Sequence, residues 1–199
     1  MSDDPRTEDH TGPERRQVTG LEVRADDGGV PVLSGYATVY EFPYDVGGFT
    51  EVITRGAGAK TANDGDIRLL INHDGVPLAR SKGGVGTMTV TSDDIGLRID
   101  APLDPTNPRA AEVISAMNRG DIDAMSFGFN VIPGRDSWDG DTRRIDEFRA
   151  VDVSVVTYPA NPATVAKVRT EESSPEVPEG ARSLDLAKRQ VQAIKSRRH

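Results

Sequence analysis

The strongest constraint on the fold is a series of short runs in which apolar and polar residues alternate. Leu21, Val23 and Ala25 alternate with polar residues, and GTMTVT at 86–91 repeats the pattern. The run Arg149–Thr157 contains four valines, most of them at alternate positions. A strand turns successive side chains to opposite faces, so this period of two predicts strands. We therefore expect a mainly β protein with a few helices, of the α+β class.

Further strands and one helix complete the predicted elements. Asn107 can cap the helix, Pro108 suits its first position, and Gly120 can end it in a left-handed conformation. Residues 133–143 are expected to form a loop, because glycine, proline and aspartate are frequent there. The additional strands are predicted at 30–33, 35–40, 67–71, 96–101 and 125–131.

Composition excludes several kinds of site. The chain has no cysteine, which rules out disulfides, thiolate metal ligands and a cysteine nucleophile. Its net charge of -8 gives no basic signature for nucleic acid, and no run approaches the ~18 apolar residues of a membrane span. The glycine-rich segment at 83–87 lacks the lysine and hydroxyl residue of a phosphate-binding loop. We expect no cofactor, no metal ion, and neither nucleic acid nor a membrane as a partner.

Changes in composition predict four segments. Residues 1–16 are polar and charged and are expected to form a disordered arm. Residues 17–169 hold the alternating runs and are expected to form the folded domain. Residues 170–181 are acidic and rich in proline, which predicts a linker. Residues 182–199 carry six Lys or Arg against one Asp, with apolar residues at helical spacing, which predicts a basic amphipathic tail helix.

One histidine is a candidate for proton transfer. Of the three histidines, His10 and His199 lie near the ends of the chain, and only His73 lies inside the expected domain. Histidine is the usual general base near neutral pH. The alternative is a surface histidine in the turn-like segment NHDG. A single internal histidine also argues against a metal site built from several histidines.

Ser126 is a candidate nucleophile. It lies on an expected strand whose Phe127 and Phe129 share one face, while Ser126 and Gly128 share the other. Gly128 would leave space beside Ser126 for another backbone segment or a ligand. The alternative is an ordinary serine on a half-exposed strand.

Asp152 is a carboxylate within a valine-rich strand. Burial of a charge is costly unless the charge is paired, and an imidazolium would be a suitable partner. The alternative is a charge on an edge strand that deters aggregation. Asp74, Asp146 and Glu147 are rival acids.

A family resemblance rests on six short motifs and their order. They are GYATVY, EVITRGA, LLINHD, a D-x-G-L hairpin at 94–97, MSFGF and VDVSVVTYPANPATVAKV. Together they resemble the phage HK97-type prohead proteases, which are related in fold to the herpesvirus assemblins. The resemblance covers about residues 18–169, so the segment 17–169 is expected to be a prohead protease domain.

The resemblance implies a fold and a mechanism. The fold would be a small closed β-barrel of the assemblin type with surrounding helices. The activity would be that of a serine endopeptidase in which Ser126 is the nucleophile and His73 the base. Family members carry an acid, most often Glu, at the place of Asp152, which implies the third member of a triad. Such an acid holds the imidazole while the base takes the serine proton.

Partners and location follow from the same resemblance. The enzyme would act inside phage proheads in the bacterial host cytoplasm, remove scaffold sequence from the major capsid protein, and cut itself, with self-association into a homo-oligomer. The alternatives are a non-catalytic capsid scaffold or core protein on the same fold, and an esterase or peptidase unrelated to capsids. The presence of Ser126, His73 and Asp152 at the matching places favours the protease.

Overall fold

The computed structural model describes residues 12–25, 29–158 and 165–167. The chain divides into two compact units, Met1–Val168 and Arg169–His199, and all described residues belong to the first. The expected linker at 170–181 and tail helix at 182–199 therefore lie outside the described residues. None of the helices described is long and apolar enough to cross a membrane.

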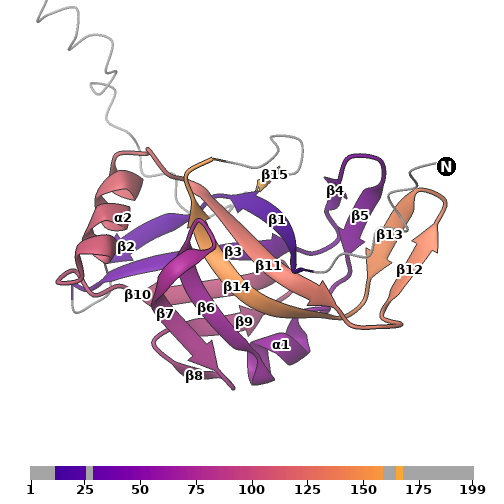
Figure 1. The fold of residues 1–199 in the computed structure, drawn as a ribbon, viewed down its shortest axis with the longest axis horizontal. Coiled ribbons are helices and arrows are strands. Elements are labelled where there is room, and N and C mark those ends of the chain that lie inside the picture. The colour runs from indigo at the N-terminus through magenta and orange to yellow at the C-terminus, as the bar shows by residue number, and fades with distance from the viewer. Residues whose placement is uncertain (1–11, 26–28, 159–164, 168–199) are drawn as a thin grey trace, which may run out of the picture. The chain divides into compact units, whose positions relative to one another are not determined.

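A seven-stranded sheet, here called the first sheet, forms one layer of the domain (Figure 1). Two neighbouring pairs, β14 with β6 and β1 with β15, are parallel, and the other pairs are antiparallel. The strands in order are β15 (Val165–Lys167), β1 (Glu14–Thr19), β11 (Ala124–Val131), β14 (Phe148–Val156), β6 (Asp66–Ile71), β7 (Asp74–Lys82) and β8 (Val85–Gly86).

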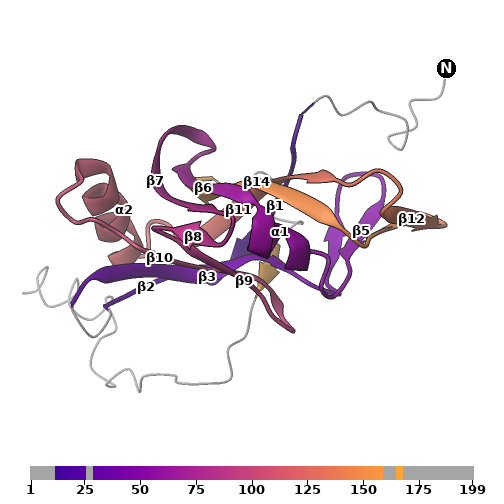
Figure 2. The same ribbon diagram turned by 90° about the horizontal axis from the view of Figure 1, so that it is seen from below.

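Two four-stranded sheets make up the rest of the β structure that is described. The second sheet is antiparallel throughout and runs below the first in the view of Figure 2. It contains β2 (Glu22–Ala25), β3 (Pro31–Val39), β10 (Gly96–Pro102) and β9 (Thr89–Ser92). The third sheet lies at one end of the domain, on the right of Figure 1. It contains β12 (Asp136–Asp139), β13 (Thr142–Ile145), β5 (Thr50–Ile53) and β4 (Pro43–Asp45).

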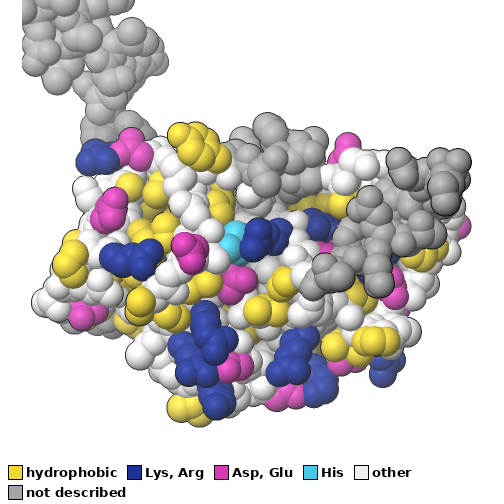
Figure 3. Space-filling view, viewed as in Figure 1, with side chains coloured by type: hydrophobic (Ala, Val, Ile, Leu, Met, Phe, Trp, Pro, Cys, Tyr) yellow, Lys and Arg dark blue, Asp and Glu magenta, His cyan; other side chains and the backbone are white. Residues whose placement is uncertain are grey.

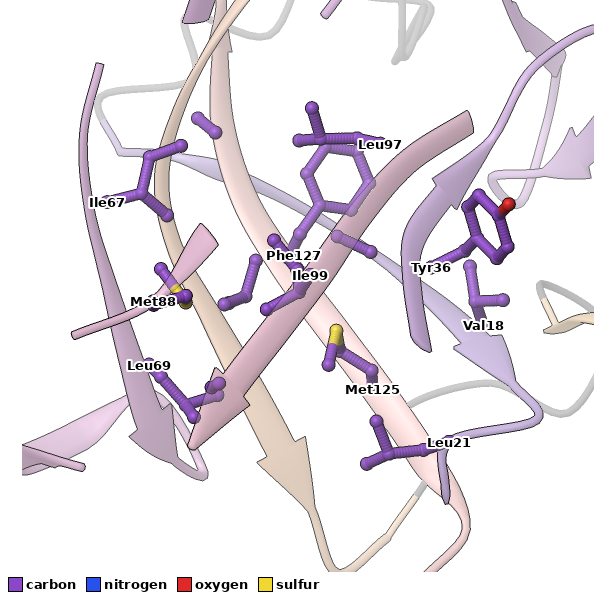
Figure 4. Packing of buried hydrophobic residues seen from close by; sticks show 14 of the residues in the cluster. Val18, Leu21, Tyr36, Ile67, Leu69, Met88, Leu97, Ile99, Met125 and Phe127 are labelled. Carbon is purple, nitrogen blue, oxygen red and sulfur yellow. The ribbon is translucent and has the colours of Figure 1, made fainter. Parts of the chain in front are cut away.

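The hydrophobic core lies between the first and second sheets. Figure 4 shows Phe127 and Met125 of β11 and Leu69 of β6 facing Ile99 and Leu97 of β10. Each of these side chains is almost fully buried. Burying one such side chain contributes about 1.5–3 kcal/mol. The face of the first sheet that contacts the second sheet is therefore the core face, and the opposite face is free to carry polar residues.

The helices within the described residues are α1 (Ala59–Asp64) and α2 (Pro108–Asn118). The predicted start of α2 is confirmed, because the Asn107 side chain accepts a hydrogen bond from the backbone N–H of Arg109 at 3.1 Å. Its predicted end is confirmed as well, since Gly120 adopts a φ of 77° directly after the cap residue Arg119.

The expectation of a closed β-barrel with surrounding helices is wrong, although the mainly β character agrees with the structure. Closure requires the two end strands of a sheet to pair with each other. Among the described residues, the first sheet ends at β15 and β8, and the other two sheets have separate end strands of their own. The described part of the chain has two helices rather than a surrounding set. Strands with one buried face suit packed open sheets as well as barrels, so alternation could not distinguish them.

Two segments differ from the expected organisation. The expected loop at 133–143 holds the hairpin of β12 and β13, in which Trp138 packs edge to face on Phe49 with ring centroids 5.0 Å apart. Strand β1 begins at Glu14, inside the segment 1–16 that we expected as an arm, and its Arg16 is buried.

A buried network of charges joins β1 to the third sheet. Glu51 of β5 is fully buried and accepts two hydrogen bonds from the Arg16 guanidinium, at 2.7 and 2.8 Å. Arg143 of β13 contacts both Glu51, at 3.4 Å, and Glu14, at 2.9 Å. Burial raises the pKa of the Glu51 carboxyl, and the Arg16 guanidinium beside it acts in the opposite direction. These contacts join β1 of the first sheet to β5 and β13 of the third sheet, which are distant from β1 in sequence.

Replacing Glu51 with glutamine should destabilise the fold by about 3 kcal/mol, since Arg16 would stay buried without its main charged partner. Urea unfolding followed by circular dichroism measures the change. Glu22→Gln is the matched control, because its partner Arg24 is exposed and exposed pairs contribute little. Equal unfolding midpoints for the two variants would contradict a stabilising role for the network.

Candidate active site

His73 lies in a tight turn between β6 and β7. Ile71 pairs with Asp74, so Asn72 and His73 are the two turn residues, with φ values of 51° and 60°. Such left-handed turns favour glycine at the second position, and holding a larger residue there costs on the order of 1–3 kcal/mol. The surrounding contacts offset this cost. The Asn72 side chain bonds to Thr157 through two hydrogen bonds of 3.0 and 3.1 Å.

The register of the central strands sets the position of the other candidates. On the antiparallel pair β11 and β14, Ser126 lies opposite Ser154, and Gly128 lies opposite Asp152. All four residues share the face of the first sheet that points away from the core. The parallel pairing of β6 with β14 places Ile71 beside Val155, so the turn after Ile71 lies close to Ser154 and Asp152. The hairpin of β6 and β7 rises from this outer face, opposite the second sheet (Figure 2).

These elements bring the three predicted residues together. The distance from His73 Nε2 to Ser126 Oγ is 2.8 Å, and the distance from His73 Nδ1 to Asp152 Oδ2 is 2.5 Å. A carboxylate only accepts hydrogen bonds, so Nδ1 carries the hydrogen and Nε2 of a neutral ring is left to accept the Ser126 hydroxyl hydrogen. The arrangement can therefore withdraw a proton from Ser126 and stabilise the resulting imidazolium.

Burial strengthens these interactions. The side chains of His73 and Asp152 are 9% and 11% exposed, and Ser126 is 1% exposed. Hydrogen bonds to charged groups are stronger where water is largely excluded. The charge that would form on His73 is met by a carboxylate in direct contact.

Ser154 is a site residue that the sequence reasoning missed. Its hydroxyl accepts a hydrogen bond from the backbone N–H of His73 and donates one to Asp152 Oδ2, each at 3.0 Å. Ser154 thus links the turn that carries the histidine to the acid. The available signal was its position two residues after Asp152, on the same face of a predicted strand.

Gly128 has a different role from the one expected. The space beside it does not receive a substrate, because the Asp152 carboxylate fills it. A β-carbon at position 128 would lie 2.6 Å from Asp152 Oδ1, well inside van der Waals contact. A glycine is therefore needed opposite the acid.

The alternatives for the acid do not contact His73 in the structure. Asp152 lies on β14, which is flanked by β11 and β6, so the interpretation as an edge-strand charge is wrong. Asp146 accepts a hydrogen bond from the Thr54 hydroxyl at 3.1 Å, and Glu147 pairs with Arg135. Asp74 follows the turn, and its side chain is exposed.

A cavity of about 190 Å³ opens beside Ser126 and His73. Figure 3 shows a histidine side chain at the surface, with a lysine or arginine side chain beside it. Within the described residues, no cluster of three or more His, Asp or Glu side chains could hold a metal ion. The remaining lining residues are Arg15, Arg16 and Gln17 of β1, Asn72, Val156 and Tyr158.

A comparison with models of protein families found a match that spans residues 19–176. The matching family is described as caudovirus prohead serine protease. No curated protein and no solved structure is a significant match. The matched range contains Ser126, His73 and Asp152 and most of the chain. The chain therefore belongs to the caudovirus prohead serine protease family, and is a serine peptidase that acts in the phage prohead and meets capsid proteins there.

Proposed function

We propose that the protein is an endopeptidase of prohead maturation in which Ser126 is the nucleophile, His73 the general base and Asp152 the acid of a triad. The single observation that carries the proposal is the pair of short hydrogen bonds on the two sides of the His73 ring. One side reaches a hydroxyl that faces a cavity, and the other reaches a buried carboxylate.

The geometry supports a complete acyl-transfer cycle. His73 Nε2 takes the hydroxyl proton as Ser126 Oγ attacks the peptide carbonyl carbon. Asp152 stabilises the imidazolium, which then gives its proton to the leaving amine. A water molecule, deprotonated by the same nitrogen, attacks the acyl-enzyme, and the proton returns to Ser126 as the acid product leaves.

An aspartate can serve here although the resemblance points more often to glutamate. The shorter side chain comes within 2.5 Å of His73 Nδ1. Two features favour this position: Gly128 leaves room for the carboxylate, and the Ser154 hydroxyl holds one of its oxygens. The aspartate thus reaches His73 directly, although it is one methylene group shorter than a glutamate.

The proposed substrates are scaffold sequence attached to the major capsid protein and the chain itself, with self-association into a homo-oligomer. A non-catalytic scaffold on the same fold is the weaker alternative. A non-catalytic scaffold would not require a histidine that is bonded on both sides of its ring by buried partners. The left-handed backbone conformation of that histidine costs stability, so a purely structural role does not explain it. An esterase or peptidase unrelated to capsids is disfavoured by the family.

Capsid processing tests the proposed function. Co-expression of the wild-type protein with the capsid protein of the same phage should give the shortened capsid protein on a gel, and Ser126→Ala should leave it at full length. Ser81→Ala is the matched control, because it removes another buried serine hydroxyl from the first sheet. Full processing by Ser126→Ala would contradict the assignment of the nucleophile.

Kinetics test the role of Asp152. Asp152→Asn should lower kcat by a factor on the order of 10³–10⁴, because the imidazolium loses its charged partner and the ring its correct tautomer. Since the two residues act as a unit, adding Asp152→Asn to His73→Ala should cause little further loss. Asp146→Asn should retain the wild-type rate. A normal rate for Asp152→Asn, with activity abolished by Asp74→Asn or Glu147→Gln, would show that another residue is the acid.

The fit of Gly128 against the acid gives a further prediction. Gly128→Ala should lower kcat on the order of 10²-fold, because the new methyl group would displace the Asp152 carboxylate from His73. Gly12→Ala is the control, since a β-carbon there meets nothing within 4 Å. Urea unfolding of both variants separates a displaced carboxylate from a damaged fold. A folded Gly128→Ala variant with normal kcat would contradict the required close approach.

A further inference from the structure

We infer that Arg15 selects substrates that carry an acidic side chain close to the scissile bond. The inference rests on the proposed function and adds a substrate class to it. Its basis is a guanidinium, in the wall of the cavity that contains Ser126 and His73, that forms no ion pair with any described residue.

The register of β1 directs Arg15 toward the site. Arg15 lies opposite Gly128 and Gln17 lies opposite Ser126 on the neighbouring strand β11. Side chains alternate along a strand, so Arg15 and Gln17 share the outer face with Ser126, whereas Arg16 points the other way. Arg15 is exposed and lines the same cavity as His73 and Ser126.

The other charges at the cavity are already paired. Arg16 is bonded to Glu51 and Glu14, and the charge of Asp152 faces His73. Among the described residues, no ion pair joins Arg15 to a carboxylate, and no aspartate or glutamate lines the cavity. Within the described part of the chain, a substrate strand entering the cavity therefore meets one positive charge without a carboxylate partner, and a substrate carboxylate is its natural complement.

The backbone that carries Arg15 is held firmly. Its carbonyl oxygen accepts a hydrogen bond from Arg16 Nη1 at 2.8 Å, and Arg16 is fixed by the buried Glu51. At Arg15 strand β1 is also paired with β11, where Arg15 lies opposite Gly128. A guanidinium on a fixed strand can pair with a carboxylate at one substrate position, rather than with acidic residues in general.

Cleavage profiling tests the inference and does not depend on a defined cleavage sequence. A peptide library prepared from a digested proteome is treated with wild type, Arg15→Gln, Arg15→Glu and Arg149→Glu, and the new termini are identified by mass spectrometry. Arg149 is the matched control, an exposed arginine on β14 of the same sheet that does not line this cavity. Ser126→Ala provides the background.

The wild type should enrich Asp or Glu at one position within about three residues of the cut. For peptides with Asp or Glu at that position, kcat/KM should be about tenfold higher than for the same peptides with Asn or Gln there. Arg15→Gln should lose this preference, Arg15→Glu should replace it with Lys or Arg, and Arg149→Glu should keep it. The preference should also weaken as salt is raised.

Three results would overturn the inference. Cleavage by the wild type without acidic enrichment, or the same profile for wild type and Arg15→Glu, would contradict it and leave the proposed function standing. Wild-type termini identical to those of Ser126→Ala would overturn the proposed function, and the inference with it.

Discussion

The register between β11 and β14 is the constraint on which the site depends. It places Ser126 opposite Ser154 and Gly128 opposite Asp152, all on the outer face of the first sheet. A slip of one residue would turn these side chains toward the core and bring phenylalanines to the surface. Phe127 and Phe129 stack with ring centroids 4.6 Å apart on the core face, so hydrophobic packing enforces the register that the polar site requires.

The histidine reaches this register through a second pairing. β6 runs parallel to β14 and ends beside Val155, where a two-residue turn presents the ring of His73. The turn is strained, and hydrogen bonds hold it against β14. The backbone N–H of His73 donates to the Ser154 hydroxyl on β14, and the Asn72 side chain accepts from the N–H of Thr157, directly after β14. Conformational strain at this point is thus balanced by contacts with the strand that supplies the acid. These contacts also keep the His73 ring between the Ser126 hydroxyl and the Asp152 carboxylate.

The sequence predicts the candidate residues better than the architecture around them. His73 stands out because it is the single histidine inside the domain, and Asp152 because a carboxylate is unusual in a strand of valines. Both signals are local. The family resemblance implies a closed barrel, and the open sheets of the structure contradict it. The alternating pattern could not correct this expectation, because it gives no information on which strands pair to close a sheet.

Long-range contacts explain what the sequence could not show. Arg16 and Glu51 are 35 residues apart, and nothing in their neighbourhoods indicates that they pair. Without that pairing, the charged start of β1 has the composition of an arm. Ser154 lies only two residues from Asp152, but its role depends on a backbone N–H from the turn after another strand. The hairpin of β12 and β13 has the composition of a loop because its turn residues outnumber its apolar ones.

The most direct test of the central claim is covalent labelling by a serine-directed phosphonate, with peptide mapping of the product. The claim is that His73 and Asp152 make the Ser126 hydroxyl a nucleophile. Wild type should gain one label, on Ser126, while His73→Ala should react far more slowly, although its Ser126 is intact. A label on a different serine, or equally fast labelling of His73→Ala, would contradict the account.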